Sequence, residues 1–411
     1  MRTRLRTPGI DRVLMLAVLA LLVLGTLLVW SATSHRTDLT GGDPTAYLRK
    51  QLVNVSIGLV LMVVVMATDH RWVRILAPLV YLASIAGLVL VLAMGTTING
   101  SQSWIDVGGM SIQPSEFAKL AVVIGMALLV AERREGRRHE VGGTEVGGML
   151  LIAGVPAALI MLQPDLGTLL VLSATVFGVL AVAGAPRRWL AVLLAGGVVA
   201  SVAAFAGHVL KPYQVDRFLA FTNPDLDPRG AGYNTEQARI AVGNGGLFGQ
   251  GLFHGTQTRA GFVPEQHTDF IFTVAGEELG LVGAAVLIGL LGLVIWRALA
   301  ISAESTDAFG RVAAAGIACW LGFQAFQNIG MCLGIMPVTG VPLPFVSYGG
   351  SSMFAVMLAV GLLQNIHLRS AASLPTRYAR PVRQSRAAGG TPISRPAVLT
   401  RQAAGSPGAR T

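Results

Sequence analysis

The sequence predicts an all-α polytopic membrane protein with about ten transmembrane helices. Of its 411 residues, 53% are hydrophobic and 13% are charged, and the mean hydropathy is +0.62. A soluble protein of this length would carry a more highly charged surface, so the composition belongs to the membrane class. The apolar residues are gathered into runs of about 20, which is the length of a helix that crosses the hydrocarbon layer.

The expected spans follow one another along most of the chain. They cover residues 13–31, 51–68, 75–94, 114–131, 147–162, 167–185, 189–208, 272–296, 312–335 and 351–368. The first run resembles the apolar part of a signal peptide, but nine further spans favour a retained anchor. Cys319 and Cys332 share the ninth span about 20 Å apart along a helix, so no disulfide between them is expected.

Arginine residues mark every second loop, which predicts the orientation of the chain. The N-terminal segment and the loops after the second, fourth, sixth, eighth and tenth spans carry arginine, whereas residues 95–113 and 336–350 contain neither Lys nor Arg. The positive-inside rule then places both termini in the cytoplasm and the long loop 209–268 outside.

The same basic segments account for the net charge of +10. They favour anionic lipid headgroups and require no nucleic acid. Residues 371–411 are rich in Arg, Ala, Pro, Gly and Ser and predict a disordered cytoplasmic tail. The chain is therefore divided into a membrane domain, residues 1–370, whose large extracytoplasmic loop covers about 209–271, and this basic tail.

The fourth span carries two charged residues that share one helix face. Pro114 suits the first turn of this helix, and Glu116 and Lys119 are three positions apart, so their side chains can pair. One interpretation is an ion pair that positions two helices. The other is that the pair faces an interior cavity and Lys119 meets an anionic ligand. The two interpretations are compatible.

The fifth and sixth spans meet at the sequence QPDLGT, in which Asp165 is expected to cap the sixth span. The following outside loop, about 60 residues, is longer than a connector requires and is expected to be functional. Within it, residues 234–251 predict a short amphipathic helix and a glycine-rich turn. The glycines miss the dinucleotide-binding spacing; they either approach a phosphate or form flexible turns, and Arg239 is the better candidate for an anion contact.

The segment GFVPEQHTDFIFTVAGEELG, residues 261–280, concentrates acids in a chain that otherwise avoids them. Asp269 is the candidate for chemistry at the membrane surface, because carboxylates are costly in a bilayer unless they have a function. A helix-capping role for Thr268 or Asp269 competes with this interpretation. Glu277 and Glu278 are expected to interact with the helix dipole, and no zinc-binding motif is present.

Two later segments carry polar residues at expected membrane depth. Gln324, Gln327 and Asn328 in the ninth span are expected to hold helices together by hydrogen bonds. The loop after it, GIMPVTGVPLPFVSYGGSSM, combines prolines and glycines as a rigid, cavity-lining segment would.

Together these segments resemble the SEDS family of cell-wall membrane proteins, and its RodA branch more than FtsW. The resemblance covers about residues 10–370 and rests on SQSWIDVGGMSIQPSEFAKL, QPDLGT, DPRGAGYNTEQARIAVGNGGLFGQG, PEQHTDFIFTVAGEELG and MPVTGVPLPFVSYGGSS. It implies a peptidoglycan glycosyltransferase that polymerises lipid II at the outer face of the bacterial cytoplasmic membrane. Its partners would be the undecaprenyl-pyrophosphate-linked glycan strand and a class B penicillin-binding protein.

The resemblance also assigns residues. Asp269 matches the essential loop aspartate of the family, and Glu116 with Lys119 matches its ion pair. Gln163, Asp165, His267 and Ser347 lie in the matched motifs as candidate supporting residues.

Glycosyl transfer needs a base for the acceptor hydroxyl and a cation beside the departing pyrophosphate. Asp269 would be that base or would hold a divalent cation, Mg or Mn. Arg239 and Lys119 are the candidate anion contacts. A lipid II flippase is the alternative function, although no internal repeat of the transporter kind is evident. A third class, a scaffold that only docks other proteins, predicts that Asp269 is dispensable.

Overall fold

A computed structural model of the chain describes residues 9–98, 101–108, 110–136, 141–207, 211–223, 227 and 230–372. The predicted disordered tail lies outside the described residues from position 373 onward, as do Arg2, Arg4 and Arg6.

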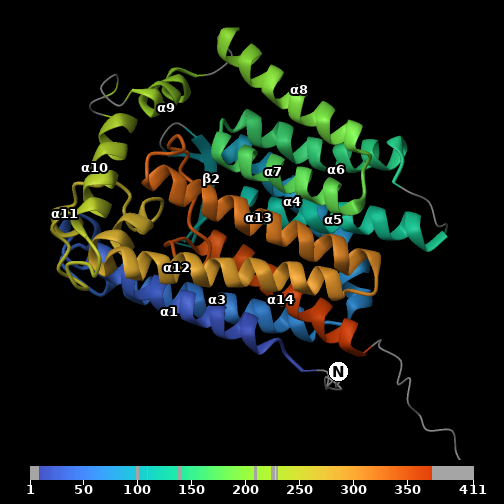
Figure 1. The fold of residues 1–411 in the computed structure, drawn as a ribbon, viewed down its shortest axis with the longest axis horizontal. Coiled ribbons are helices and arrows are strands. Elements are labelled where there is room, and N and C mark those ends of the chain that lie inside the picture. Colours follow the sequence, from blue (N-terminus) through green and yellow to red (C-terminus); the bar gives the residue numbers. More distant parts are fainter. Residues whose placement is uncertain are drawn as a thin grey trace, which may run out of the picture. The chain divides into compact units, whose positions relative to one another are not determined.

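Among the described residues, ten helices are long and apolar enough to cross a membrane, which confirms the predicted number. Figure 1 shows them side by side. They are α1 (Arg12–Ser34), α3 (Ala46–Ala67), α4 (His70–Met94), α5 (Pro114–Gly136), α6 (Gly143–Leu162), α7 (Leu166–Ala183), α8 (Arg187–Ala206), α12 (Ile271–Glu304), α13 (Ala308–Cys332) and α14 (Gly350–Ala372). The largest difference from expectation is in α12, which continues to Glu304 instead of ending near residue 296.

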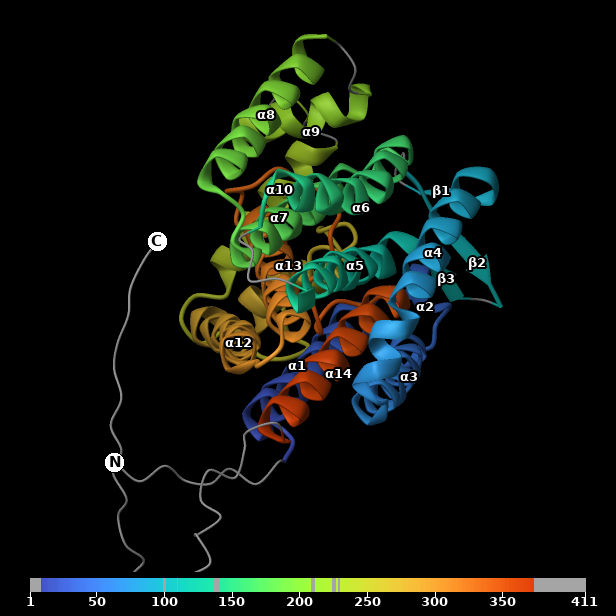
Figure 2. The same cartoon turned by 90° about the vertical axis from the view of Figure 1, so that its right-hand side faces the viewer.

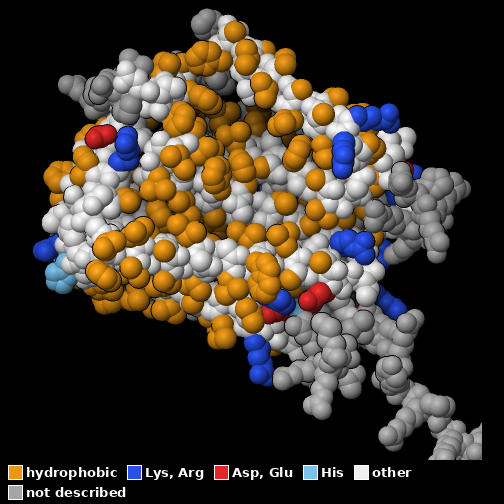
Figure 3. Space-filling model, viewed as in Figure 1, with side chains coloured by type: hydrophobic (Ala, Val, Ile, Leu, Met, Phe, Trp, Pro, Cys, Tyr) orange, Lys and Arg blue, Asp and Glu red, His pale blue; other side chains and the backbone are white. Residues whose placement is uncertain are grey.

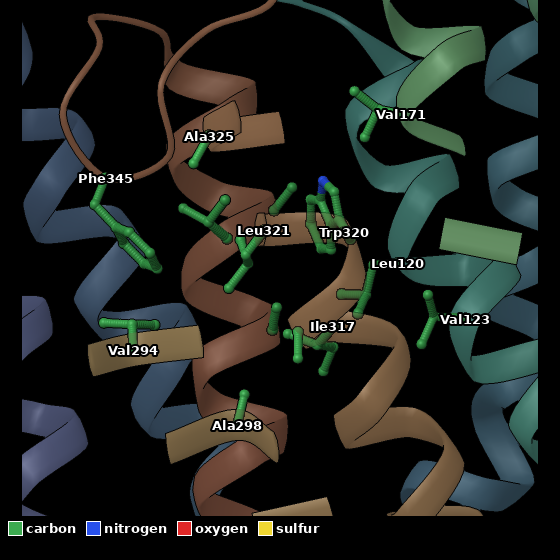
Figure 4. Close-up of a cluster of buried hydrophobic side chains, with 14 of the residues drawn as sticks. Leu120, Val123, Val171, Val294, Ala298, Ile317, Trp320, Leu321, Ala325 and Phe345 are labelled. Carbon is green, nitrogen blue, oxygen red and sulfur yellow. The ribbon is translucent and has the colours of Figure 1, made fainter. Parts of the chain in front are cut away.

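Helix α13 lies at the centre of the bundle. It packs against α5, α7 and α12, and its Trp320 is fully buried. Figure 4 shows this core, in which side chains of α13 meet Leu120 and Val123 of α5, Val171 of α7 and Val294 of α12. Because a mostly buried helix can carry amides that bond inward, α13 is suited to support a site.

Helix α8 stands apart from the other spans in Figures 1 and 2. None of its residues is buried, and Val192, Leu194 and Val199 are at least 60% exposed. Figure 3 shows apolar side chains across the flank of the bundle, with most charged groups toward its ends. An apolar flank of this kind suits a membrane environment.

The two ends of the bundle differ in character. At the end where α1 begins and α14 finishes, called the terminal end, Arg297 donates to Asp11 through Nε at 2.8 Å. Gln364 brackets the same turn, since Asp11 N donates to its Oε1 and its Nε2 donates to Asp11 O, both at 3.0 Å. At the opposite end, called the loop end, the described residues after α8 form three shorter helices, namely α9 (Pro212–Thr222), α10 (Ala231–Asn244) and α11 (Thr256–Ala260).

Residues 95–113, expected as a loop, contain a small antiparallel sheet. Its strands β1 (Thr96–Ile98), β2 (Ser101–Val107) and β3 (Met110–Ile112) follow chain order, with Thr97 opposite Gln102 and Ile105 opposite Ile112. Thr, Ile, Trp and Val favour strands, a preference that the glycines and polar residues of the segment obscured. Ser101 Oγ donates to Gln163 O at 2.8 Å and joins the sheet to the α6–α7 turn.

Helix α12 is interrupted at Gly280, whose φ of 67° and ψ of −168° are not helical. The glycine-rich turn after α10 fills the interruption. Leu281 N donates to Gly246 O at 2.9 Å and Val282 N to Leu247 O at 3.1 Å, while Gln250 N donates to Glu277 O at 3.0 Å. We call this arrangement of residues 246–251 and 277–282 the interlock. It satisfies the backbone groups that the broken helix leaves open.

Candidate active site

Asp269 lies in the tight turn of residues 264–270 that leads into α12. The carbonyl of Glu265 accepts hydrogen bonds from the N–H groups of Thr268 at 3.2 Å, Asp269 at 3.1 Å and Phe270 at 3.2 Å. The N-cap of α12 is Phe270, with no side-chain bond to the helix. The alternative in which Thr268 or Asp269 caps this helix is therefore wrong, and the Asp269 carboxylate is not engaged in capping.

The backbone of this turn is held from α13 by one amide. Asn328 Nδ2 donates to Asp269 O at 2.6 Å and to Val341 O at 2.7 Å. Asn328 is fully buried, so it ties the Asp269 turn to the loop of residues 333–349. A Cβ placed on Gly340 in that loop would lie 3.3 Å from Asp269 Oδ2. The carboxylate therefore rests directly against Gly340.

A cavity of about 340 Å³ opens at Asp269. Its walls come from α9, the start of α10, the Asp269 turn and the 333–349 loop. The lining residues are Tyr213, Asp216, Arg217, Asp227, Gly230, Ala231, Asn234, Pro264, Glu265, Asp269, Phe270, Val338 and Gly340. Asp269 is half-buried, and within the described ranges of the chain neither of its carboxylate oxygens has a hydrogen-bond partner.

The electrostatic surroundings make Asp269 easy to protonate. Burial raises its pKa to about 7, and the nearby negative charges of Glu265 and Asp165 act in the same direction. The positive charge of Arg217 opposes them. A carboxyl group with a pKa near neutrality can take up and release a proton under physiological conditions.

Among the described residues, the basic side chain that lines this cavity is Arg217, which was not among the residues predicted from the sequence. Its guanidinium lies 5.5 Å from the ring centre of Tyr213, one turn earlier on α9, at a distance typical of a cation–π contact. Arg239 is exposed on α10, with its aliphatic stem against Gly334, and does not line the cavity. The spacing of Tyr213 and Arg217, four positions apart on a helix, was the sequence pattern that could have indicated this residue.

Glu116 and Lys119 form the predicted ion pair, with Lys119 Nζ 2.7 Å from Glu116 Oε1. Both side chains are buried, and Lys119 also donates to Gln324 Oε1 at 2.7 Å. Gln324 Nε2 in turn donates to Pro342 O at 2.9 Å. The pair therefore supports the 333–349 loop from below and does not line the cavity.

The amides of α13 act on this loop more than on neighbouring helices. Gln324 and Asn328 bond to its carbonyl groups, and Gln327 Nε2 donates to Thr339 Oγ1 at 2.8 Å. The expectation that these amides hold helices together is correct for Gln324, which accepts a hydrogen bond from Lys119 and so joins α13 to α5. The contact that all three amides share is the loop beside Asp269.

The remaining candidates occupy the surroundings of the cavity. Asp165 caps α7 as predicted, because its Oδ1 accepts from Thr168 N at 2.9 Å, and Oδ2 accepts from Gln113 Nε2 at 3.1 Å. Gln163 is fully buried and donates to Leu88 O at 3.0 Å. These two residues hold the α6–α7 turn, and none of their atoms lines the cavity.

His267 and Ser347 stabilise the contact between the Asp269 turn and the 333–349 loop. Tyr348 N donates to His267 O at 2.9 Å, and the His267 ring lies 5.0 Å from Tyr47 and 5.7 Å from Tyr348, measured between ring centres. Burial lowers the pKa of His267, so its neutral form is favoured. Ser347 Oγ accepts from Leu343 N at 2.8 Å within a turn.

Glu277 and Glu278 are not in the first turn of α12, so the expected helix-dipole role is wrong. Glu277 is fully buried and accepts from Gln257 N at 2.7 Å and Thr258 N at 2.9 Å, which caps α11. Glu278 accepts from Ser31 Oγ of α1 at 2.6 Å. Both acids therefore attach the loop end to the helices.

The glycine-rich turn has a packing role. Cβ atoms added to Gly245 and Gly249 would collide with the carbonyls of Gly276 and Glu278, so only glycine lets the turn approach α12 so closely. The N–H groups of Gln250 and Gly251 are bonded to α12 carbonyls. The turn is neither flexible nor available to a phosphate through those groups.

Comparison with known proteins places this architecture among cell-wall proteins. Residues 12–372 match the cell cycle protein family of FtsW, RodA and SpoVE. The chain is similar to the peptidoglycan glycosyltransferase MrdB of Escherichia coli K12, with 40% identity over 362 residues that cover 87% of this chain and 93% of MrdB. It is also similar to the stage V sporulation protein E of Bacillus subtilis 168, with 36% identity over 372 residues, 89% of this chain and 98% of that protein.

Two solved structures share the fold. A chain of a peptidoglycan synthase complex, solved to explain how polymerisation and crosslinking are coordinated, is 34% identical with a TM-score of 0.74, and the match covers 88% of this chain and 98% of that one. The rod shape determining protein RodA of Thermus thermophilus is 31% identical with a TM-score of 0.63, over 87% of this chain and 97% of that one.

Proposed function

The chain belongs to the FtsW, RodA and SpoVE family, and we propose that it polymerises lipid II into glycan strands, as a peptidoglycan glycosyltransferase of the bacterial cytoplasmic membrane. Similar proteins bear the name peptidoglycan glycosyltransferase, and ten apolar helices fit a multi-pass membrane protein. The observation that carries the site assignment is the Asp269 carboxylate, which faces a cavity without a hydrogen-bond partner among the described residues.

Asp269 acts as the general base in this proposal. The acceptor sugar hydroxyl attacks the anomeric carbon of the donor, the bond from that carbon to the lipid pyrophosphate breaks, and Asp269 takes the hydroxyl proton. One carboxylate suffices for such an inverting displacement, without a covalent enzyme intermediate. A pKa near 7 suits the task, because the base is then substantially ionised at neutral pH and still accepts a proton readily.

Arg217 is the group that we assign to the departing pyrophosphate. It lines the cavity that holds Asp269, and a guanidinium matches phosphate oxygens in both charge and geometry. Arg239 and Lys119 were the predicted contacts, and neither lines the cavity. Lys119 serves the site instead by supporting the loop through Gln324 and Pro342.

A divalent cation, Mg or Mn, is the rival role for Asp269. Among the described residues no three His, Cys, Asp or Glu side chains converge on a point where a metal could sit. Mg²⁺ is often held by only one or two carboxylates together with substrate phosphates, and Asp269 with Glu265 fits that pattern. Such a cation would neutralise charge on the leaving pyrophosphate.

The positive charges support the orientation that we assign to the chain. Arg71, Arg187, Arg311 and Arg369 belong to helix ends at the terminal end, which the positive-inside rule assigns to the cytoplasm. Asp269 then lies at the outer face, where the lipid-linked glycan strand would grow. A class B penicillin-binding protein is the expected partner, in line with the synthase complex that the chain resembles.

The test is polymerisation of purified lipid II with and without a transpeptidase-dead penicillin-binding partner. Asp269→Ala and Asp269→Asn should abolish strand formation, a loss of about 10²- to 10⁴-fold for a general base. Asp216→Asn, which changes another acid of the same cavity, is the matched control and should retain activity.

A titration with Mg²⁺ and Mn²⁺ separates the two roles of Asp269. If it is the base, wild type works after chelation and the variants stay inactive at every metal concentration. If it holds a cation, chelation silences wild type. Equal strand formation by wild type and Asp269→Ala would refute the site, and movement of lipid II across vesicles without polymerisation would favour the flippase.

A further inference from the structure

Leu247 and Phe248 form the tip of the glycine-rich turn, and both are unusually exposed. The exposed fractions are 62% for Leu247 and 80% for Phe248. The surrounding sequence, residues 242–253, contains no Asp, Glu, Lys or Arg. A loop tip in water normally carries polar or charged side chains, so this composition indicates an apolar environment.

The depth of the turn can be read along two helices. Gly280 precedes Arg297 by 17 residues, which is about 26 Å of helix. On α1, Ser31 follows Asp11 by 20 residues, about 30 Å, and Ser31 bonds to Glu278 while Asp11 bonds to Arg297. Both measures place the interlock near the far edge of a hydrocarbon layer about 30 Å thick.

The tip is continuous with the lipid-facing side of α12. Val282 N donates to Leu247 O, so the turn lies directly on this part of the helix. Leu281, Val282 and Val286 are 61%, 50% and 52% exposed. The apolar surface of the tip therefore extends that of the membrane-spanning helix.

The interlock also holds the tip rigidly at this depth. Its hydrogen bonds satisfy both the broken helix and the turn, and backbone groups at the edge of the hydrocarbon need such internal partners. A flexible loop could fold its apolar tip back against the protein. This turn cannot, because its backbone is hydrogen-bonded to the outer side of α12. Its Phe and Leu side chains stay directed away from the protein.

We propose that Leu247 and Phe248 are a membrane anchor that inserts into the acyl region of the lipid leaflet at the loop end. The occupant is lipid, because the surface is apolar, lies at the hydrocarbon edge and continues the lipid-facing side of α12. This anchor fixes the height of the loop-end helices relative to the bilayer.

Spin labelling of the full chain in nanodiscs of phosphatidylethanolamine and phosphatidylglycerol tests the anchor. Phe248→Cys is labelled in a Cys319→Ala background, since Cys332 is fully buried. Oxygen is apolar and partitions into the hydrocarbon, whereas a charged nickel chelate stays in water. Val286→Cys is the lipid-facing reference, and Ala260→Cys, at the exposed last residue of α11, is the solvent reference.

The label at 248 should resemble that at 286, with an oxygen-to-nickel accessibility ratio several-fold above that at 260. A ratio equal to that at 260 would overturn the anchor. So would shielding from both reagents upon addition of a penicillin-binding partner, because a protein would then cover the tip. A photoreactive residue at 248 in the otherwise unchanged chain gives a second measurement, in which crosslinks to phospholipid are expected and their absence contradicts the proposal.

Discussion

Asp11 and Asp269 are both acids at the ends of membrane-spanning helices, and their surroundings are opposite. Asp11 Oδ1 accepts from Val13 N and Leu14 N, both at 3.1 Å, and Oδ2 accepts from Arg297. The Asp269 carboxylate has no partner among the described residues and faces a cavity. One acid is used to join α1 to α12, and the other is left available to a ligand.

The difference shows how a membrane protein distributes charge. A buried charge is tolerated when a partner and hydrogen bonds compensate its lost hydration. Asp269 lacks that compensation, and its pKa rises to about 7 because of burial. The polar groups around it instead donate hydrogen bonds to its backbone carbonyl and to the neighbouring loop. The turn is therefore held in place while the carboxylate stays reactive.

The largest expected effect is on stability at the terminal end. Arg297→Met leaves the Asp11 charge buried and unpaired, which should cost about 3–5 kcal/mol of unfolding free energy. Polymerisation per folded molecule should remain unchanged, because Asp269 is untouched. Thermal unfolding in detergent and strand synthesis measure the two. The double variant with Asp11→Asn should recover part of the stability, and no recovery would contradict the pairing argument.

Asn328→Ala and Asn365→Ala compare equivalent amides at the two ends. Asn328 Nδ2 binds the carbonyls of Asp269 and Val341, and Asn365 Nδ2 binds Thr68 O at 2.6 Å and Val65 O at 3.1 Å. Each loss removes the amide donor from carbonyls that are buried or partly buried, at about 1–3 kcal/mol.

Only Asn328→Ala should also lower kcat, by about ten- to hundredfold, because it releases the base from its position. KM should change much less. Steady-state kinetics on lipid II measure the split, and an equal kcat loss in Asn365→Ala would show that instability alone explains both variants.

The dependence of the polymerisation rate on pH should report the ionisation of Asp269. Because the pKa of Asp269 is about 7, the ionised fraction rises about tenfold from pH 6 to pH 8, and so should the rate. Its folded pKa is raised above the unfolded value, so the stability that it contributes at low pH is lost as the pH rises through about 7. A rate profile and unfolding temperatures between pH 5 and 9 check both slopes.

Asp269→Asn is the control for the pH dependence of stability, since an asparagine side chain does not ionise. Its unfolding temperature should change less between pH 6 and 8 than that of wild type. A rate that is flat over this range in wild type would contradict the assignment of Asp269 as base.

The smallest expected effect concerns two glycines of the 333–349 loop. Gly340 and Gly334 have φ values of 68° and 70°, so alanine at either should cost about 1–2 kcal/mol through backbone strain. Gly340→Ala also places a methyl group against Asp269 Oδ2 and should reduce the rate per folded molecule a few-fold. Gly334→Ala should spare the rate, and equal rates in the two variants would indicate that the carboxylate tolerates the contact.

Local features were predictable from sequence because their partners are neighbours in the chain. The spacing of Glu116 and Lys119 indicated the ion pair, and Asp165 before an apolar run indicated the cap of α7; both are confirmed. The sheet at residues 96–112 was missed, because short strands with polar residues give a weak periodic signal. The helix-dipole interpretation of Glu277 failed because α12 begins two turns earlier.

The sequence by itself determined the membrane class, the ten spans and the position of Asp269 before the eighth span, because composition, run length and the rarity of acids are properties of single segments. Only the tertiary structure decided that Arg217 and not Arg239 lines the cavity, and that Asn328 holds a carbonyl 59 positions away. It also decided that the glycine-rich turn packs into the break of α12. Such contacts depend on how distant segments meet in space, and no local spacing encodes that meeting.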